Sequence, residues 1–222
     1  LGKQEHLSAV RLEEIASVTK PRGIPIMVDA ASEHIESPSP WLKRGADLVI
    51  YSGGKFLRGP QTSGLLLGSK RLCQAAWRNG SPHQALGRPM KVSKEDIVGV
   101  VTALEYWFGE RDTAAERQKW YDDCAAVAER LGQLDGVHGE VVDPEGVDRV
   151  PRLKIVWDRG RYPLNGLDLR QRVLEGEPRV MLDDNSVTES SITVDPFQLQ
   201  PGEATQVGDA VVAVLRASLT NR

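Results

Sequence analysis

Two short apolar segments of the sequence end in residues that could do chemistry together. Residues 24–29 end in Asp29, and residues 47–52 are followed by Gly53-Gly54-Lys55. Both segments are short and bounded by glycine or proline, which predicts buried strands of a parallel sheet. Because ligands of an α/β sheet bind beyond the carboxyl ends of its strands, we expect Asp29 and Lys55 to face one ligand.

An amine and a carboxylate in this arrangement suit pyridoxal 5'-phosphate. The cofactor needs a lysine amine for its aldehyde and a carboxylate that keeps its ring nitrogen protonated. Gly53 and Gly54 give the backbone the freedom to bring Lys55 across the strand ends. Ser52 is placed to hydrogen-bond a phosphate oxygen.

Each residue taken singly also has a simpler interpretation. An aspartate at the end of a strand is commonly a turn former or a helix cap, and a single lysine is usually a solvated surface charge. A phosphate-binding P-loop is excluded, because Phe56 follows Lys55 and the upstream glycine of that motif is absent.

The first part of the chain alternates helices and strands, which predicts an α/β sheet. Apolar spacing and breakers predict an opening helix with Leu7, Val10, Ile15 and Val18 on one face, a short helix at 41–44, a strand at 63–67 and a helix at 70–79. A long helical pattern covers 93–134 and breaks near 109–112. Ser93 and Asp96 resemble a capping box at its start, and Ile97, Val98, Val101 and Leu104 form its apolar stripe.

The second part predicts a small α+β layer of two helices and four strands. The strands are expected at 137–142, 153–157, 179–182 and 191–194, and the helices at 167–174 and 203–219. We therefore divide the chain into the C-terminal part of a large cofactor-binding α/β domain (1–92), linking helices (93–135) and a small C-terminal α+β domain (136–222).

Composition excludes several classes of protein. The 222 residues carry a formal net charge of −3 with 28 basic and 31 acidic side chains, scattered along the chain, so no nucleic-acid-binding surface is expected. No apolar run is long enough for a membrane span. The two cysteines imply no disulfide framework, which favours a reducing, cytoplasmic location. The chain opens with Leu1 in a helix that no strand precedes. This predicts a fragment that lacks its N-terminal portion, the alternative being a mature or engineered terminus.

Several motifs together resemble fold-type-I pyridoxal-phosphate enzymes. They are Val28-Asp29-Ala30-Ala31, the segment 45–55, Gly59-Pro60-Gln61-Thr62-Ser63-Gly64 and the segment 87–95. The closest branch is the one related to selenocysteine synthase (L-seryl-tRNA selenium transferase), and within it the D-glucosaminate-6-phosphate ammonia-lyases. The resemblance extends more weakly to 176–179.

The resemblance implies a role for each matching residue. Lys55 forms the Schiff base and moves protons at the substrate α-carbon, Asp29 pairs with the pyridine nitrogen, and a small Ala31 lets the ring pack over it. Arg179 binds a substrate carboxylate, or is a surface arginine. Five residues could contact an anionic substrate, and Arg88 is favoured among them: His34, Arg78, His83, Arg88 and Lys91. A homo-oligomer is also implied, with the phosphate-binding glycine-serine loop upstream of Leu1.

The leading hypothesis is β-elimination or deamination of a small amino acid or amino-sugar acid. Gly53-Gly54 stands where selenocysteine synthase usually has glycine-aspartate, and no basic surface is evident, so selenium transfer on seryl-tRNA ranks second. Transamination, racemisation, a non-catalytic subunit of the same fold and an unrelated α/β binding protein stay as alternatives.

Overall fold

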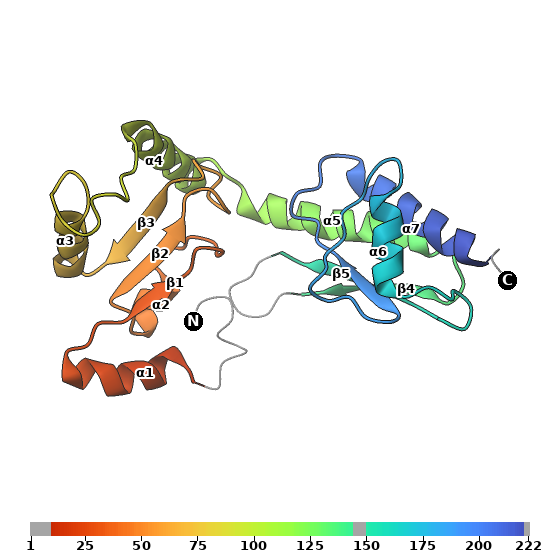
Figure 1. Ribbon diagram of the computed structural model, residues 1–222, viewed down its shortest axis with the longest axis horizontal. Coiled ribbons are helices and arrows are strands. Elements are labelled where there is room, and N and C mark those ends of the chain that lie inside the picture. The colour runs from red at the N-terminus through yellow and green to blue at the C-terminus, as the bar shows by residue number, and fades with distance from the viewer. Residues whose placement is uncertain (1–9, 144–149, 220–222) are drawn as a thin grey trace. The chain divides into compact units, whose positions relative to one another are not determined.

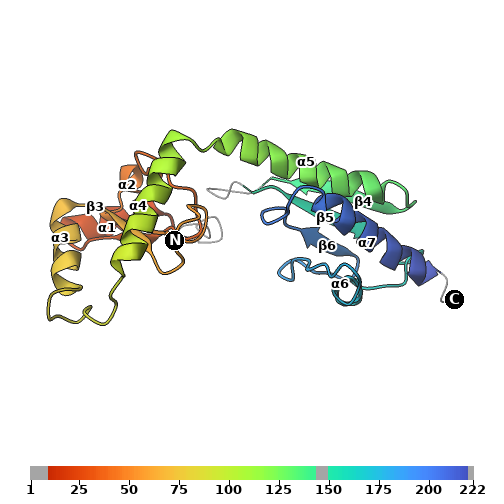
Figure 2. The same ribbon diagram turned by 90° about the horizontal axis from the view of Figure 1, so that it is seen from above.

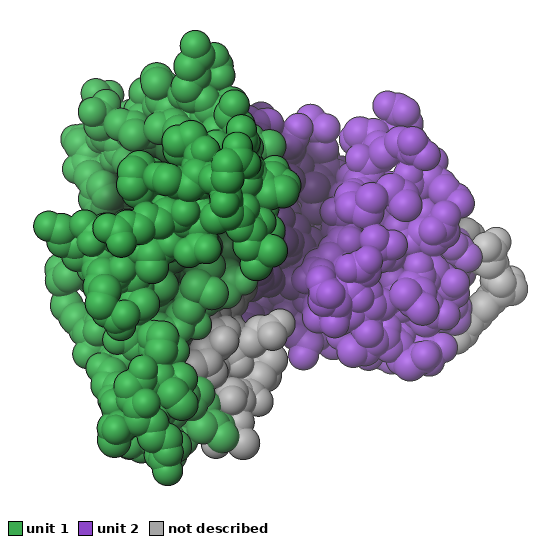
Figure 3. Space-filling view, turned by 60° about the vertical axis from the view of Figure 1, so that its left-hand side comes forward, with its two compact units in different colours: residues 1–111, 145–148 green, residues 112–144, 149–222 purple. Residues whose placement is uncertain are grey.

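The computed structural model describes residues 10–143 and 150–219. They form two compact units, which Figure 3 colours separately. The first unit runs to Arg111, and the second begins at Asp112. The predicted domain boundaries near residues 92 and 135 remain predictions.

The first unit is built on a three-stranded sheet with the order β1-β2-β3, whose strands lie side by side in Figure 1. Its strands are β1 (Met27–Asp29), β2 (Leu48–Ser52) and β3 (Gly64–Gly68). β1 runs parallel to β2, and β3 is antiparallel to β2. The sheet confirms the parallel pairing of the two predicted strands, but β1 covers only residues 27–29 of the predicted 24–29 and is buried on one face instead of both.

One face of this sheet is buried and the other is open. Val28, Val49 and Tyr51 are each at most 1% exposed, whereas Met27 and Asp29 are exposed on the opposite face of β1. Side chains alternate between the two faces of a strand, so the burial pattern fixes which way each residue points. Asp29 therefore lies on the open face.

Four α-helices accompany the sheet in the first unit. They are α1 (Leu12–Thr19), which continues into the 3-10 turn η2 (Lys20–Arg22), then α2 (Pro40–Arg44), α3 (Lys70–Asn79) and α4 (Lys94–Gly109). α1 begins after the predicted position Leu7, which lies outside the described residues. α2 packs Trp41 into the core at 1% exposure. The Trp41 indole donates to Glu33 over 2.6 Å.

The N-terminus of α4 has the Ser93 half of the predicted capping box, while the Asp96 carboxylate accepts from the Thr62 hydroxyl over 2.7 Å. The Ser93 hydroxyl accepts a hydrogen bond from the Asp96 amide over 3.0 Å, which satisfies one of the free N–H groups of the first turn. The prediction that the apolar stripe of α4 faces the core is wrong. Ile97, Val98 and Val101 are 52%, 66% and 47% exposed, while Val100 and Trp107 are buried. The helix turns Gly99 toward Pro60, which rotates the predicted stripe outward.

The second unit is an antiparallel sheet with the order β4-β5-β6 and three helices. The elements are α5 (Thr113–Leu131), β4 (Val137–Val142), β5 (Arg152–Trp157), α6 (Gly166–Leu174), β6 (Ser191–Val194) and α7 (Glu203–Leu219). α5 and α7 lie side by side in both views (Figures 1 and 2). A Cβ at Gly208 would lie 2.8 Å from Arg130 side-chain atoms, so the glycine permits this close approach.

The predicted strand at 179–182 is wrong. These residues form no strand, and only Asp183 makes an isolated bridge, to Thr193. Val180 and Leu182 nevertheless point into the core. Alternate residues are thus buried, but the backbone at 179–182 makes no strand pairing. The second unit has three strands in its sheet instead of four.

No helix within residues 10–143 and 150–219 combines the length and the apolar character of a membrane span.

Cys124 should be inert in the folded protein. It is fully buried on α5, and burial raises the pKa of its thiol to about 12. With this pKa only about one Cys124 thiol in ten thousand is ionised at pH 8. The thiolate is the form that reacts, so the folded protein should react very slowly. We expect Cys73→Ala, which leaves Cys124 as the single cysteine, to bind no thiol reagent when native and one equivalent in urea. Reaction of the native variant at a rate near that in urea would contradict this burial.

Candidate active site

Asp29 presents its carboxylate at the carboxyl end of β1. It is the last residue of the strand and is exposed on the open face of the sheet. Its Oδ1 accepts a hydrogen bond from the Ala31 amide over 3.0 Å. That contact turns the chain away after the strand and fixes the carboxylate at the sheet edge. The turn-former interpretation of Asp29 and its use as a ligand group are thus compatible.

Ser52 lies beside Asp29 on the neighbouring strand. Asp29 pairs with Ile50 in the parallel register. Ser52 comes two residues later and so points to the same face. Its hydroxyl accepts from the Gly54 amide over 3.3 Å. The structure therefore brings the predicted aspartate and serine to one face at the ends of adjacent parallel strands.

Lys55 stands in a turn that is held at both ends. The Gly53 amide donates to Ser63 over 2.9 Å, and the Gly59 amide donates to Gly53 over 2.7 Å. The Arg58 amide donates to the Lys55 carbonyl over 2.9 Å. Next in sequence, Phe56 and Leu57 are 7% and 2% exposed, while Lys55 itself is exposed. The backbone is thus anchored by two buried side chains, and the lysine side chain faces solvent.

The two glycines before the lysine are required by close packing. A Cβ at Gly53 would lie 1.9 Å from the Ser63 Oγ, and one at Gly54 would lie 2.6 Å from the Gln61 Cα. Gln61 Nε2 also donates to the Gly54 carbonyl over 3.0 Å. The sequence argument assigned backbone freedom to these glycines; the structure adds that there is no room for a side chain.

A layer of rings from α4 and the β1–α2 loop supports this turn. The His34 ring lies edge-on against Phe56 and Trp107, with centroids 4.2 and 5.4 Å away. The Trp107 indole donates to the Ile35 carbonyl over 3.0 Å, and the Arg111 guanidinium donates to the Phe56 carbonyl. His34, a possible substrate contact by sequence, is here part of the packing under the lysine turn.

The remaining predicted residues lie at other places. Ala31 is half-buried directly after the Asp29 turn. Arg88 is half-buried in the α3–α4 connection, and its Nε is buried without a hydrogen-bond partner in the described structure. Arg179 is exposed in the second unit, where its Nε donates to the Leu174 carbonyl over 3.3 Å. The roles assigned to these residues stay predictions.

The other three candidate anion contacts lie on α3 or in the α3–α4 connection. Arg78 and Lys91 are exposed. His83 packs edge-on against Trp77 with centroids 4.3 Å apart, and its Nδ1 lies 3.2 Å from the Trp77 carbonyl oxygen. Nothing about them adds to the sequence argument.

Sequence reasoning missed Arg58 and Arg111. Arg58 has a φ of 58°, which L-residues other than glycine, asparagine and aspartate rarely adopt. Nothing in the sequence marks an arginine for that conformation. Arg111 lies where only a helix break was predicted, and its guanidinium sits 4.4 Å over the Trp107 ring.

Comparison with curated proteins gives relatives in agreement with the sequence resemblance. The chain is 29% identical over 192 residues to D-glucosaminate-6-phosphate ammonia lyase of Salmonella typhimurium, covering 86% of this chain and 49% of that protein. It is 30% identical over 198 residues to 5'-C-glycyluridine monooxygenase-decarboxylase of a Streptomyces species, covering 88% and 47%. L-seryl-tRNA(Sec) selenium transferase of Proteus mirabilis matches over 105 residues at 29% identity, covering 42% and 21%. The chain spans about half the length of the first two relatives. No family model matches.

Solved structures give the same result for the fold. A D-glucosaminate-6-phosphate ammonia-lyase structure matches with a TM-score of 0.71 at 27% identity, over 94% of this chain and 54% of that one. A structure described as SPT with a PLP internal aldimine matches with a TM-score of 0.52 at 14% identity, over 95% and 52%. The predicted fold class is confirmed: the chain has the fold of the fold-type-I pyridoxal-phosphate enzymes.

The contact between Gly53 and Ser63 can be tested by a double-mutant cycle. Gly53→Ala should destabilise the first unit by about 2 kcal/mol or more, because the new methyl group overlaps the serine hydroxyl. Adding Ser63→Ala removes that oxygen and should restore about 1 kcal/mol relative to the sum of the single changes. Urea unfolding of all four proteins measures the coupling. Strict additivity would show that the two residues do not meet.

Proposed function

We propose that the protein is a pyridoxal-phosphate-dependent lyase that acts on a small amino acid or amino-sugar acid. The observation that carries the proposal is the placement of Asp29 and Ser52 on one face at adjacent parallel strand ends, with Lys55 exposed in the anchored turn that follows. Similarity to an ammonia lyase over most of this chain supports it.

The residues at this sheet edge fit the cofactor. Asp29 offers an exposed carboxylate to the ring nitrogen, and the small Ala31 leaves room for the ring beside it. Ser52 offers a hydroxyl to a phosphate oxygen, although its hydroxyl also accepts from the Gly54 amide. When bound, pyridoxal phosphate supplies an electron sink for the substrate α-carbon. Lys55 Nζ would hold the cofactor and then take the α-proton.

The substrate's negative groups need cationic partners. Arg88 is the better placed candidate, since its buried Nε lacks a hydrogen-bond partner in the described structure and an unsatisfied buried donor is costly unless a ligand uses it. Arg179 could bind a carboxylate through two parallel hydrogen bonds. The proposed net reaction removes the α-proton and a β-substituent, and water then releases the nitrogen as ammonia and leaves a keto acid.

A second outcome is favoured by a specific observation. A monooxygenase-decarboxylase matches as well as the ammonia lyase does, so loss of carbon dioxide is an alternative to loss of ammonia. Selenium transfer on seryl-tRNA is supported by a match to a smaller part of the chain. Assay of D-glucosaminate 6-phosphate for released ammonia, carbon dioxide and keto acid separates the first two outcomes, and binding of tRNA tests the third. The homo-oligomer and the cytoplasmic location belong to the same proposal.

The cofactor lysine can be identified without any substrate. We expect the full-length protein to gain a visible absorbance band with pyridoxal phosphate, and borohydride to fix the cofactor on the peptide that contains Lys55. Lys55→Ala should abolish both, whereas Lys70→Ala, an exposed lysine on α3, should change neither. Asp29→Asn should weaken cofactor binding about tenfold or more, because it removes a charged hydrogen-bond partner.

The result that would reject the assignment is equally direct. Labelling at another lysine, or equal affinity of the wild type and Asp29→Asn, would mean that this sheet edge does not hold the cofactor.

A further inference from the structure

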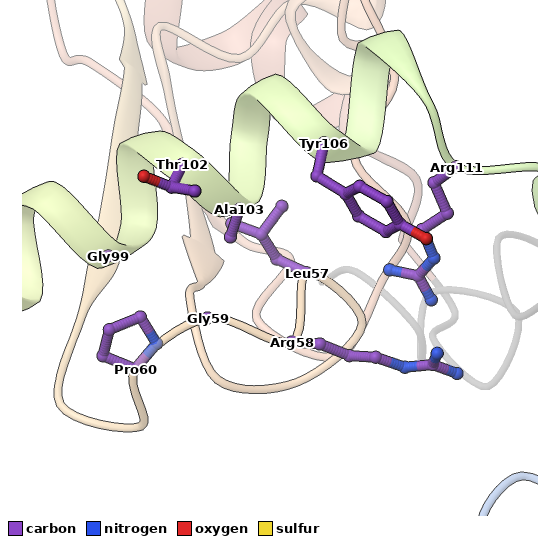
Figure 4. Close-up of a pocket in the computed structure, with 9 residues that line it drawn as sticks. All are labelled: Leu57, Arg58, Gly59, Pro60, Gly99, Thr102, Ala103, Tyr106 and Arg111. Atoms are coloured by element: carbon purple, nitrogen blue, oxygen red, sulfur yellow. The ribbon is translucent and has the colours of Figure 1, made fainter.

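A pocket lies between α4 and the turn that carries Lys55. It has a volume of about 510 Å³, within the range of small-molecule sites. Leu57, Gly59, Pro60, Gly99 and Ala103 give it an apolar wall. Its polar groups come from four further residues, drawn in Figure 4: Arg58, Thr102, Tyr106 and Arg111. All lie in the first unit.

Arg58 is held in a conformation that an arginine does not prefer. Among the described residues it is the one non-glycine with a positive φ, at 58°. The turn enforces this through the hydrogen bonds of the Arg58 and Gly59 amides to Lys55 and Gly53. Glycine would adopt this φ without strain, so the turn holds an arginine there at a conformational cost. The Arg58 side chain borders the pocket (Figure 4).

Arg111 brings a second guanidinium to the same pocket from the end of α4. The Arg111 amide donates to the Tyr106 carbonyl over 2.9 Å, which turns the chain back toward the helix. The guanidinium is oriented by the Trp107 ring beneath it, at 4.4 Å, and by the Phe56 carbonyl, to which Nη1 donates. One guanidinium is therefore prepositioned before any ligand arrives.

We propose that this pocket binds the phosphate or carboxylate group of a small organic anion through Arg58 and Arg111. Guanidinium groups match both anions by paired N–H donors. The hydroxyls of Thr102 and Tyr106 add hydrogen-bonding capacity, and Leu57, Pro60 and Ala103 accept a carbon skeleton. The anion is either the remote group of the substrate or a separate effector. In both cases the group that binds is a phosphate or a carboxylate.

The pocket shares its wall with the lysine turn. A Cβ at Gly59 would lie 3.0 Å from the Gly53 carbonyl oxygen and 3.1 Å from the Ala103 Cβ. The turn is thus in close contact with itself and with α4, and a ligand against Arg58 also contacts the segment that presents Lys55. The inference needs no bound cofactor, so its failure and that of the proposed function are separable.

Binding should be measured by calorimetry on the full-length, cofactor-free protein. The probes are inorganic phosphate, glucose 6-phosphate, and glucose as the uncharged control. We expect the two phosphates to bind and glucose not to bind. Arg58→Gln should weaken phosphate binding about tenfold, and added salt should weaken it further. The matched control is Arg71→Gln, an exposed arginine on α3, which should leave it unchanged.

Arg58→Gly separates binding from folding. Because glycine adopts this φ without strain, its thermal midpoint should equal or exceed that of the wild type, while phosphate binding falls as in Arg58→Gln. Equal phosphate affinity of the wild type and both Arg58 variants would overturn the proposal. It would also be overturned if Arg58→Gly lost phosphate affinity and unfolded at a lower thermal midpoint than the wild type.

The source of the anion is distinguished with cofactor-loaded protein. If the pocket holds the substrate's remote group, inorganic phosphate competes with a phosphorylated substrate in turnover, and Arg58→Gln raises its KM. If it holds an effector, phosphate binds equally well with and without substrate. Either result supports a site at Arg58, and phosphate affinity that depends on Lys55 but not on Arg58 would overturn it.

Discussion

The parallel pairing of β1 with β2 is the constraint on which the candidate site depends. Asp47 fixes this register through two hydrogen bonds to Ile26, one from its side chain and one from its backbone amide. Its Oδ2 accepts from the Ile26 amide over 2.8 Å, and its amide donates to the Ile26 carbonyl over 2.9 Å. A slip of one residue would turn Asp29 to the buried face of the sheet. Burial of Val28 and Val49 on that face makes the slip costly, so the same packing that stabilises the sheet aims the carboxylate.

The turn after β2 follows directly from this register and holds the backbone of Lys55 in a defined position. Two buried side chains, Phe56 and Leu57, fix the turn from below, and the ring of His34 joins Phe56 to Trp107 of α4. A site built on a packed layer holds its groups more precisely than a free loop does. The sheet edge, the turn and α4 are therefore one structural unit, and a change under Phe56 will reach Lys55.

The sequence predicted the elements with strong patterns and missed what depends on three-dimensional context. The helix at 203–219 and the strand at 191–194 agree with the structure residue for residue, because a strong period and clear breakers define them. The strand at 179–182 failed, since alternation reports a buried face and not the sheet hydrogen bonds themselves. Ile97 and its neighbours failed because the approach of Gly99 to Pro60, distant in sequence, decides which side of α4 is buried. The placement of Asp29 and Ser52 at one edge of the sheet was predictable from their positions at strand ends. Arg58 was not, since a positive φ at an arginine comes from the turn around it.

Strain at Arg58 gives the pocket a thermodynamic connection to the lysine turn. A non-glycine residue with positive φ costs about 1 kcal/mol or more, and the hydrogen bonds and buried side chains of the turn offset that cost. A ligand bound to the Arg58 side chain in the proposed pocket would add to the interactions that offset this cost. The backbone conformation of Arg58 is thus the point at which the proposed pocket and the lysine turn meet.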